Sequence, residues 1–210
     1  MAGFRDGIVR GAEWVELDLH QTADGALVVF HDFALGGRRL ARMTLAEAKQ
    51  RARRLRGIEL PSLAEVFDAL PRSIGVNVEI KAPGLGRELL AVLSRHRATE
   101  RVLVSSFHHP TITALADLRP RVATGLLSRR RLRDPVGTLR RYRARALVLH
   151  HSAVDAKSVN RLHEAGFTVW VWTVNRERDL RCMLTVGVEA IITDYPDRLL
   201  RLRDAASRRA

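Results

Sequence analysis

The sequence contains a single cysteine, Cys182, and no long hydrophobic run. One cysteine excludes an internal disulfide framework and a cysteine-rich zinc site. Because its neighbourhood is helical and apolar, we expect Cys182 to fill the core rather than to act as a nucleophile. The longest apolar stretches have only the length of a strand, so none is long enough to span a membrane. The absence of a charged-then-apolar signal segment predicts a cytoplasmic protein.

Lysine is also scarce, since only Lys49, Lys81 and Lys157 occur, and arginine therefore supplies nearly all of the formal net charge of +13. Such a charge attracts anions and polyanions. The arginines cluster at 129–145 and 198–209. Two interpretations stay open: solvated helix faces with a frayed tail, or a patch that makes transient contact with an anionic membrane surface or with nucleic acid. No aromatic and basic nucleic-acid motif accompanies the arginines, so we expect no specific nucleic-acid partner.

The sequence does contain a regular alternation of strand-like and helix-like segments, over a length that suits one domain. Main strands are expected near residues 15, 77, 104, 125, 148, 171 and 192. This alternation predicts parallel βαβ units with right-handed crossovers. The run at 26–31 follows the turn at 23–25 and is expected to extend the first strand as a hairpin. Thr44 and Glu47 predict a capping box ahead of a helix that ends at Arg56.

Seven main strands fall one short of the eight in a (β/α)8 barrel, a fold of about 250 residues. The chain also begins with a predicted helix, at 3–11, rather than with a strand. We therefore expect an α/β protein, a TIM (β/α)8 barrel that lacks its first strand. The predicted division is one barrel domain at 1–200 and a basic tail at 201–210.

Charged side chains stand near the ends of the early strands. The first main strand carries Glu16 and Asp18. They project to one face, because side chains at i and i+2 of a strand do so. Two carboxylates on one face repel unless they share a cation or bind a proton. Hard oxygen ligands favour Mg²⁺, Mn²⁺ or Ca²⁺. The pattern predicts a metal site, and an ion-paired exposed edge is the alternative.

Glu79 and Lys81 end the next main strand with the same spacing. The carboxylate is suited to complete the metal site, and the ammonium is suited to bind a phosphate oxygen as a point charge. A plain internal salt bridge between the two is the alternative interpretation. Together the two strands predict a site for a divalent cation and a phosphate.

Histidine follows the hairpin strand as His31, with Asp32 directly after it. The pKa of an imidazole suits proton transfer near neutrality, and catalytic residues of a barrel lie at this end of its strands. A purely structural His-Asp pair is the alternative. His20 shares the strand face of Asp18 and is a second candidate.

Polar or aromatic groups also end the later strands, at 105–107, 150–151, 170–173 and 193–196. Each group taken singly is more typical of packing than of function. Their shared position, where the loops after the strands begin, predicts one pocket at the carboxyl-terminal rim of the barrel.

In order and spacing these motifs resemble the glycerophosphodiester phosphodiesterase family. The matching segments run from residue 3 to about 200 and centre on 11–18, 21–25, 28–32, 60–66, 78–81, 105–107, 171–175 and 187–196. The resemblance implies a (β/α)8 barrel that hydrolyses glycerophosphodiesters to glycerol 3-phosphate and an alcohol. It also implies a small-molecule partner, either a glycerophosphodiester or a lysophospholipid.

The resemblance further implies roles for individual residues. His31 matches the second of two catalytic histidines, the general acid for the leaving alkoxide. Lys81 matches a basic residue beside the phosphate, and Trp172 matches an aromatic wall of the pocket. Three carboxylates match the ligands of one divalent cation, Mg²⁺ or Ca²⁺: Glu16, Asp18 and Glu79.

The sequence departs from the family pattern at its beginning. The family starts with a strand that ends in His-Arg-Gly and a loop of Pro-Glu-Asn-Thr, and neither motif occurs here. Two explanations stay open: the natural protein is longer, or it is a shortened relative that only binds phosphate or phospholipid. Because a histidine, an arginine and a glutamate of the site are missing, we expect the chain as given to be nearly inactive and poorly stable.

Overall fold

The fold is described from a computed structural model, which covers residues 1–118 and 121–208 of the chain. One sheet has the strand order β10-β9-β8-β7-β6-β5-β1-β2. Its parallel strands are β1 (Trp14–Gln21), β5 (Gly75–Ile80), β6 (Val102–Ser106), β7 (Ala123–Ser128), β8 (Ala146–His150), β9 (Thr168–Trp172) and β10 (Ala190–Ile191). These are the seven main strands that the sequence predicts. The antiparallel strand β2 (Leu27–Val29) pairs with the end of β1, as expected for a hairpin extension.

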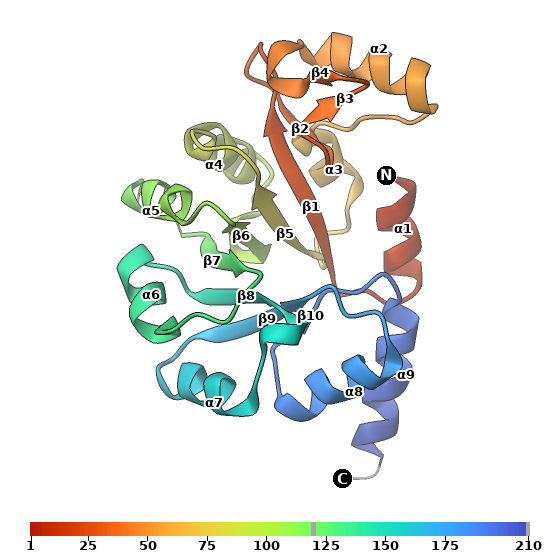
Figure 1. The fold of residues 1–210 in the computed structure, drawn as a ribbon. Helices are drawn as coiled ribbons and strands as arrows, with labels where there is room; N and C mark the ends of the chain where they lie inside the picture. Colours follow the sequence, from red (N-terminus) through yellow and green to blue (C-terminus); the bar gives the residue numbers. More distant parts are fainter. Residues whose placement is uncertain (119–120, 209–210) are drawn as a thin grey trace.

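The sheet is curled, and the helices between its parallel strands cover its outer side (Figure 1). The helices are α1 (Ala2–Val9), α2 (Leu45–Arg56), α3 (Leu63–Ala69), α4 (Gly86–Arg95), α5 (His109–Asp117), α6 (Pro135–Tyr142), α7 (Ala156–Glu164), α8 (Glu177–Val186) and α9 (Pro196–Ser207). This arrangement confirms the predicted α/β architecture of barrel type. Within the described ranges the strands do not form a closed ring, because β10 lies at one end of the sheet and β1 with β2 at the other.

Short polar motifs begin the helices after the hairpin. The Thr44 hydroxyl accepts from the Glu47 amide, and the Glu47 carboxylate accepts from the Thr44 amide at 2.8 Å, so the predicted capping box is confirmed. Ser62 and Glu65 form a second capping box at α3. A small hairpin of β3 (Ala34–Leu35) and β4 (Arg38–Arg39) precedes α2 and was not predicted, since strands of two residues carry no hydrophobic period.

The core lies mainly between the sheet and its helices. On β5, Val76, Val78 and Ile80 belong to the cluster that packs against the outer helices. Because successive strand side chains point to opposite faces, Asn77 and Glu79 face the barrel interior. Both are buried. The outward residues therefore supply the apolar packing that fixes β5, while its inward residues are polar and available for chemistry.

Side chains bridge the two ends of the curled sheet. The Trp14 ring on β1 meets the Trp170 ring on β9 edge to face, with 4.9 Å between the centroids. On the outside, Arg203 of α9 forms an ion pair with Glu13 at 3.1 Å. These contacts hold β1 next to the last strands without a shared strand ladder.

Two expectations about the carboxyl-terminal part need correction. Cys182 is exposed, because the buried stripe of α8 runs through Leu180 and Met183 instead. The tail is not frayed at 201–207, since α9 continues to Ser207 and buries Leu202. The predicted domain boundary at residue 200 thus falls inside a helix, and positions 209–210 lie outside the described residues. No helix in the described part of the chain combines the length and apolar content that a membrane crossing requires.

Candidate active site

Three carboxylates converge where β1 and β5 run side by side. In the parallel register Asp18 lies opposite Glu79, and Glu16 lies opposite Asn77. Oxygen atoms of Glu16, Asp18 and Glu79 all lie within 4.8 Å of one another. The convergence follows from the register, because inward positions at equal height on adjacent strands are neighbours. Such a group of hard oxygen donors has the chemistry that Mg²⁺ and Ca²⁺ prefer.

Lys81 lies directly after β5 and completes the cluster. Its Nζ is 2.9 Å from Asp18 Oδ1 and 2.7 Å from Glu79 Oε1. The three side chains are only 11 to 15% exposed. The internal salt bridge that we held as an alternative is therefore present. It leaves Glu16 as the carboxylate of the cluster without an ion pair to Lys81.

Electrostatic crowding shows in the protonation of the cluster. Burial, followed by the charges of Asp18 and Glu79, raises the pKa of Glu16 to about 8. Burial also raises the pKa of Glu79, although Lys81 opposes the shift. For Lys81 itself, burial lowers the pKa, but the hydrogen bonds to Glu79 and Asp18 outweigh it and the net direction is upward. At neutral pH Glu16 therefore carries a proton that a cation would displace.

A buried amide, that of Asn77, lies beside the cluster. Asn77 is 2% exposed, and its Oδ1 accepts a hydrogen bond of 2.9 Å from Ser105 on β6. Asn77 was not among the predicted site residues. Its spacing of two residues from Glu79 is the signal that places it on the same face. The Ser105 contact ties the inner faces of β5 and β6 together beside Glu16.

His31 lies on the loop after β2, outside the group of three carboxylates. Its Nδ1 is 2.8 Å from Asp32 Oδ1, and the side chain is 81% exposed. The hydrogen bond from His31 is the main cause that lowers the pKa of Asp32, and Arg56 adds to it from 3.5 Å. His31 is also near enough for its charge to act on Glu79. The loop thus presents an imidazole, oriented by a carboxylate, on the side of the cluster.

The second histidine candidate has a different environment. His20 is 4% exposed and stacks edge to face on Phe33 with 5.1 Å between ring centroids. Burial lowers its pKa, and its Nε2 has no hydrogen-bond partner among the described residues. The ring shares the strand face of Asp18 but is not one of the converging ligands. Its contacts are those of a neutral packing residue.

An aromatic group occupies the rim at the ends of the later strands. Trp172 ends β9, and its Nε1 donates to the Val148 carbonyl at 3.2 Å. Its ring meets Phe107 and His150 edge to face, with centroid distances of 5.4 and 5.1 Å. Arg129 lies over both Phe107 and Trp172. In the sequence Arg129 is one member of an arginine run, and nothing there predicts this contact.

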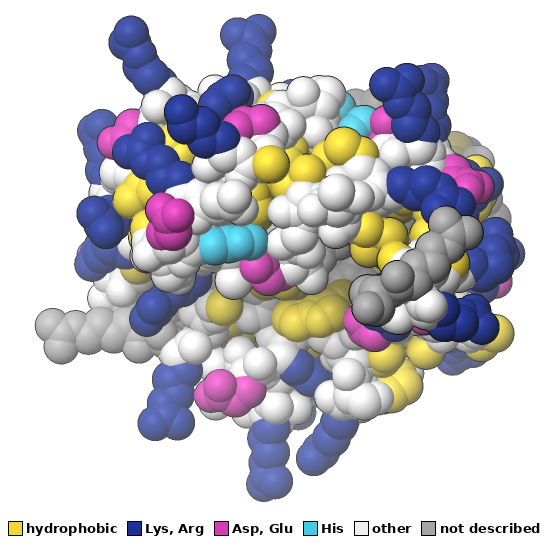
Figure 2. Space-filling model, turned by 90° about the horizontal axis from the view of Figure 1, so that it is seen from below, with side chains coloured by type: hydrophobic (Ala, Val, Ile, Leu, Met, Phe, Trp, Pro, Cys, Tyr) yellow, Lys and Arg dark blue, Asp and Glu magenta, His cyan; other side chains and the backbone are white. Residues whose placement is uncertain are grey.

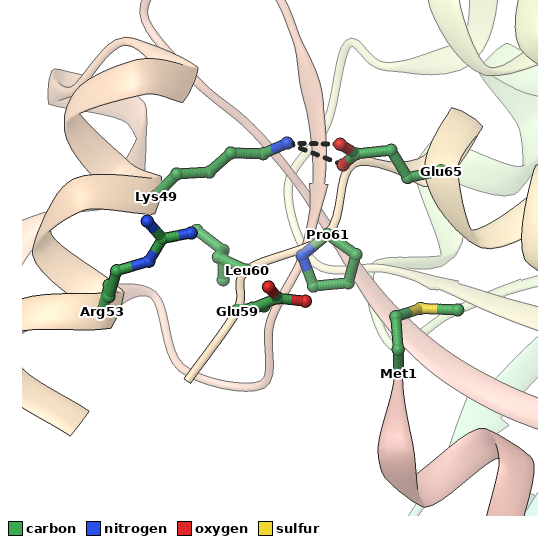
Figure 3. Close-up of a pocket in the computed structure, with 7 residues that line it drawn as sticks. All are labelled: Met1, Lys49, Arg53, Glu59, Leu60, Pro61 and Glu65. Atoms are coloured by element: carbon green, nitrogen blue, oxygen red, sulfur yellow. Dashed lines mark hydrogen bonds and ion pairs between the residues drawn. The ribbon is translucent and has the colours of Figure 1, made fainter. Parts of the chain in front are cut away.

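A cavity of about 290 Å³ lies away from this rim, between α2, the segment before α3, and Met1 (Figure 3). Lys49 on α2 bridges its side to Glu65 on α3, with Nζ 2.6 Å from Oε1. None of the converging carboxylates lines this cavity. The candidate site is therefore the carboxyl-terminal rim and its acidic cluster, where barrel enzymes keep their chemistry.

Comparison with known proteins gives one consistent result. The model of the glycerophosphoryl diester phosphodiesterase family matches residues 1–198. A glycerophosphodiester phosphodiesterase of Caldanaerobacter subterraneus subsp. tengcongensis is 31% identical, over 96% of this chain and 90% of that protein. One from Bacillus altitudinis is 29% identical, over 97% and 91%. A solved Oleispira antarctica phosphodiesterase in complex with the product sn-glycerol-3-phosphate has a TM-score of 0.84 and 26% identity, over 97% of this chain and 89% of that chain.

Proposed function

Since the chain belongs to the glycerophosphoryl diester phosphodiesterase family, we propose that it hydrolyses glycerophosphodiesters to glycerol 3-phosphate and an alcohol at the rim cluster, with one divalent cation. The observation that carries the proposal is the convergence of Glu16, Asp18 and Glu79 within 4.8 Å, beside Lys81. Lysophospholipids, which share the glycerophosphodiester group, are the related substrate class.

The three carboxylates fit a divalent cation. Their oxygen atoms are hard donors, and the crowding that raises the pKa of Glu16 is the repulsion that a cation relieves. Mg²⁺ and Ca²⁺ both suit such a set. When bound, the cation would polarise a phosphoryl oxygen and neutralise charge that develops on it. Binding would also release Lys81 from part of its salt bridge.

The other residues are suited to the rest of the reaction. Lys81 holds a phosphate oxygen with its ammonium, which carries a full charge at neutral pH. Water bonds to phosphorus and loses a proton to the solvent, the bond from phosphorus to the alcohol oxygen breaks, and protonated His31 gives that oxygen its proton. Asp32 orients the imidazole through Nδ1, which leaves Nε2 for the transfer. Trp172 forms an apolar wall next to the substrate.

We propose a cytoplasmic location, with the arginine-rich segment 129–145 in transient contact with an anionic membrane surface. Several of these arginines already form ion pairs, such as Arg131 with Asp155 at 3.1 Å and Arg143 with Asp117. The free charge for such contact is therefore smaller than the sequence alone suggests. Salt would weaken the contact, because the charges involved are exposed.

The test is hydrolysis of glycerophosphocholine by the purified chain with Mg²⁺, with Ca²⁺ and with chelator. We expect hydrolysis only with a cation. We also expect kcat/KM to fall at least about a hundredfold for Glu16→Gln, Asp18→Asn and Glu79→Gln, because each substitution removes a carboxylate that would bind the cation directly. Glu88→Gln, at an exposed position of α4, is the control and should behave as the parent chain. Activity that survives chelation would contradict the proposal.

The same assay separates the enzyme from a non-catalytic binder. Calorimetric titration with Mg²⁺ or Ca²⁺ measures the acidic cluster without any reaction. Cation binding that depends on Glu16 but comes with no hydrolysis would favour the phosphate-binding alternative. It would also agree with the low activity expected from the sequence, whereas brisk hydrolysis would refute that expectation.

A further inference from the structure

Arg129 is held in place by two aromatic rings at the rim. It directly follows β7, and its guanidinium carbon lies 5.3 Å from the ring centroid of Phe107 and 5.3 Å from that of Trp172. The two rings meet edge to face, at 5.4 Å between centroids. A guanidinium over two ring faces is attracted by both π-systems, so its position is restrained although the residue is exposed.

The donors of Arg129 are not used by the protein. Within residues 1–118 and 121–208, Arg129 has neither an ion pair nor a side-chain hydrogen bond, whereas Arg131 two positions later pairs with Asp155 at 3.1 Å. A guanidinium carries five N–H donors in a fixed fork that matches a carboxylate or phosphate. Since no described side chain or carbonyl accepts from them, these donors are available to a ligand. The arrangement is thus a positioned cation without an anion.

Arg129 also stands on the same rim as the acidic cluster. The strands β5, β6, β7, β8 and β9 are parallel neighbours in the sheet, so their carboxyl ends share one side. Glu79 and Phe107 come from the ends of β5 and β6, while Arg129 and Trp172 come from those of β7 and β9. A substrate whose phosphate lies at the cluster would extend its remaining groups along this rim.

Arg129 supplies a positive charge to the part of the rim that Phe107, His150 and Trp172 form. His150 lies 5.1 Å from Trp172, between ring centroids. Burial, followed by the charges of His151 and Arg129, holds the pKa of His150 below its ordinary value. The His150 imidazole is therefore neutral at pH 7 and adds no charge.

We propose that Arg129, on its platform of Phe107 and Trp172, is an anion-binding subsite that selects glycerophosphodiesters with a negatively charged group in the alcohol part. This inference rests on the proposed function. Aromatic faces at such a rim would otherwise attract a quaternary ammonium. Here the guanidinium already lies over Phe107 and Trp172, at 5.3 Å from each centroid, and its charge repels a second cation. Headgroups such as choline are disfavoured, and headgroups with a carboxylate are favoured.

Glycerophosphoserine and glycerophosphoethanolamine form a matched pair, because they differ only by the serine carboxylate. We expect kcat/KM of the parent chain to favour glycerophosphoserine by about tenfold, as one charge-assisted bidentate contact provides. Arg129→Gln should bring the ratio close to one. Arg129→Lys keeps the charge but loses the fork, so an intermediate ratio is expected. Arg130→Gln is the control, since Arg130 is exposed. Its amide donates to the Ser128 hydroxyl and its carbonyl accepts from that hydroxyl, and neither hydrogen bond depends on the side chain.

Dissociation constants for the same two compounds, measured by calorimetry with Mg²⁺ present, keep the inference testable whatever the turnover. A serine preference that Arg129→Gln abolishes, with no hydrolysis of either compound, would support the subsite and refute the proposed function. Hydrolysis of both compounds with equal constants, or a preference that Arg129→Gln retains, would refute the subsite and leave the proposed function intact. Binding of neither compound would refute the subsite.

Discussion

Glu16 combines burial with two neighbouring carboxylates, and Lys81 reaches those neighbours instead. Its pKa of about 8 means that the folded protein keeps a proton there which an ordinary glutamate would lose near 4.5. The folded state therefore binds more protons than the unfolded state between these values. By linkage, the free energy of unfolding falls as pH rises through this window.

We predict that the chain in chelator loses stability steadily from pH 5 to pH 8, and that Glu16→Gln removes most of this dependence because its amide does not titrate. Urea or thermal unfolding at several pH values measures the effect. Added Mg²⁺ should raise the melting temperature more at pH 8 than at pH 6, because the cation competes with the proton. Glu88→Gln should keep the parent profile.

Glu79, whose pKa burial also raises, adds to the fall in stability, and Glu16→Gln separates the two contributions. Glu65 acts outside this window. The pKa of Glu65 is lowered to about 2, first by the hydrogen bond from Lys49 and then by the Ser62 amide. A lowered folded pKa contributes stability above the ordinary value and loses it as pH falls toward about 2. A parent profile that rises from pH 5 to pH 8, or one that Glu16→Gln leaves unchanged, would contradict the assignment of Glu16.

At the scale of elements, most of the fold follows from the pattern of apolar and polar residues in the sequence. The strand β1 occupies 14–21 as predicted, because apolar residues alternate there with charged and polar ones. The hairpin of β3 and β4 could not be predicted, since two residues define no period. The closeness of Asp18 and Glu79 could be expected, because parallel strands with matched ends place equivalent inward residues side by side.

The sequence could not predict which residues from distant segments come into contact. Arg129 looks like any member of its run until the positions of β6, β7 and β9 place it over Phe107 and Trp172. The exposure of Cys182 likewise depends on which side of α8 faces the sheet. Both outcomes are set by packing between elements, which local periodicity does not specify.

The strand β5 begins with a glycine, Gly75, and has no room for a larger residue there. A Cβ added to Gly75 would lie 2.2 Å from Cδ2 of Trp14, the ring that contacts Trp170. We predict that Gly75→Ala displaces the Trp14 ring and destabilises the fold by about 1–3 kcal/mol. Urea unfolding measures the loss, and near-ultraviolet circular dichroism reports the altered tryptophan pair.

A double-mutant cycle locates the cause of this loss. If the clash with the indole ring is responsible, Gly75→Ala should cost much less in a Trp14→Ala background. Gly3→Ala is the matched control, because a Cβ there meets nothing within 4 Å and alanine favours the helix. Equal costs of Gly75→Ala in both backgrounds would show that Trp14 does not depend on the glycine.

At the scale of the whole molecule, arginine supplies nearly all of the positive charge. On the face drawn in Figure 2, Lys and Arg side chains ring the outline and hydrophobic side chains gather toward the middle. On this face the positive charge forms no single stripe, and a net charge of +13 attracts anions as a diffuse field. Such a field attracts any polyanion without reading its sequence.

We therefore predict weak binding of the chain to duplex DNA that is equal for unrelated sequences and steeply dependent on salt. With about four phosphate contacts, the association constant should fall roughly a hundredfold between 50 and 200 mM salt. Fluorescence anisotropy with two labelled duplexes of unrelated sequence measures both properties. Glu16→Gln should bind the duplexes as the parent chain does, because the acidic cluster is buried in the rim. A far weaker salt dependence, or a preference for one of the two sequences, would instead indicate a dedicated nucleic-acid site.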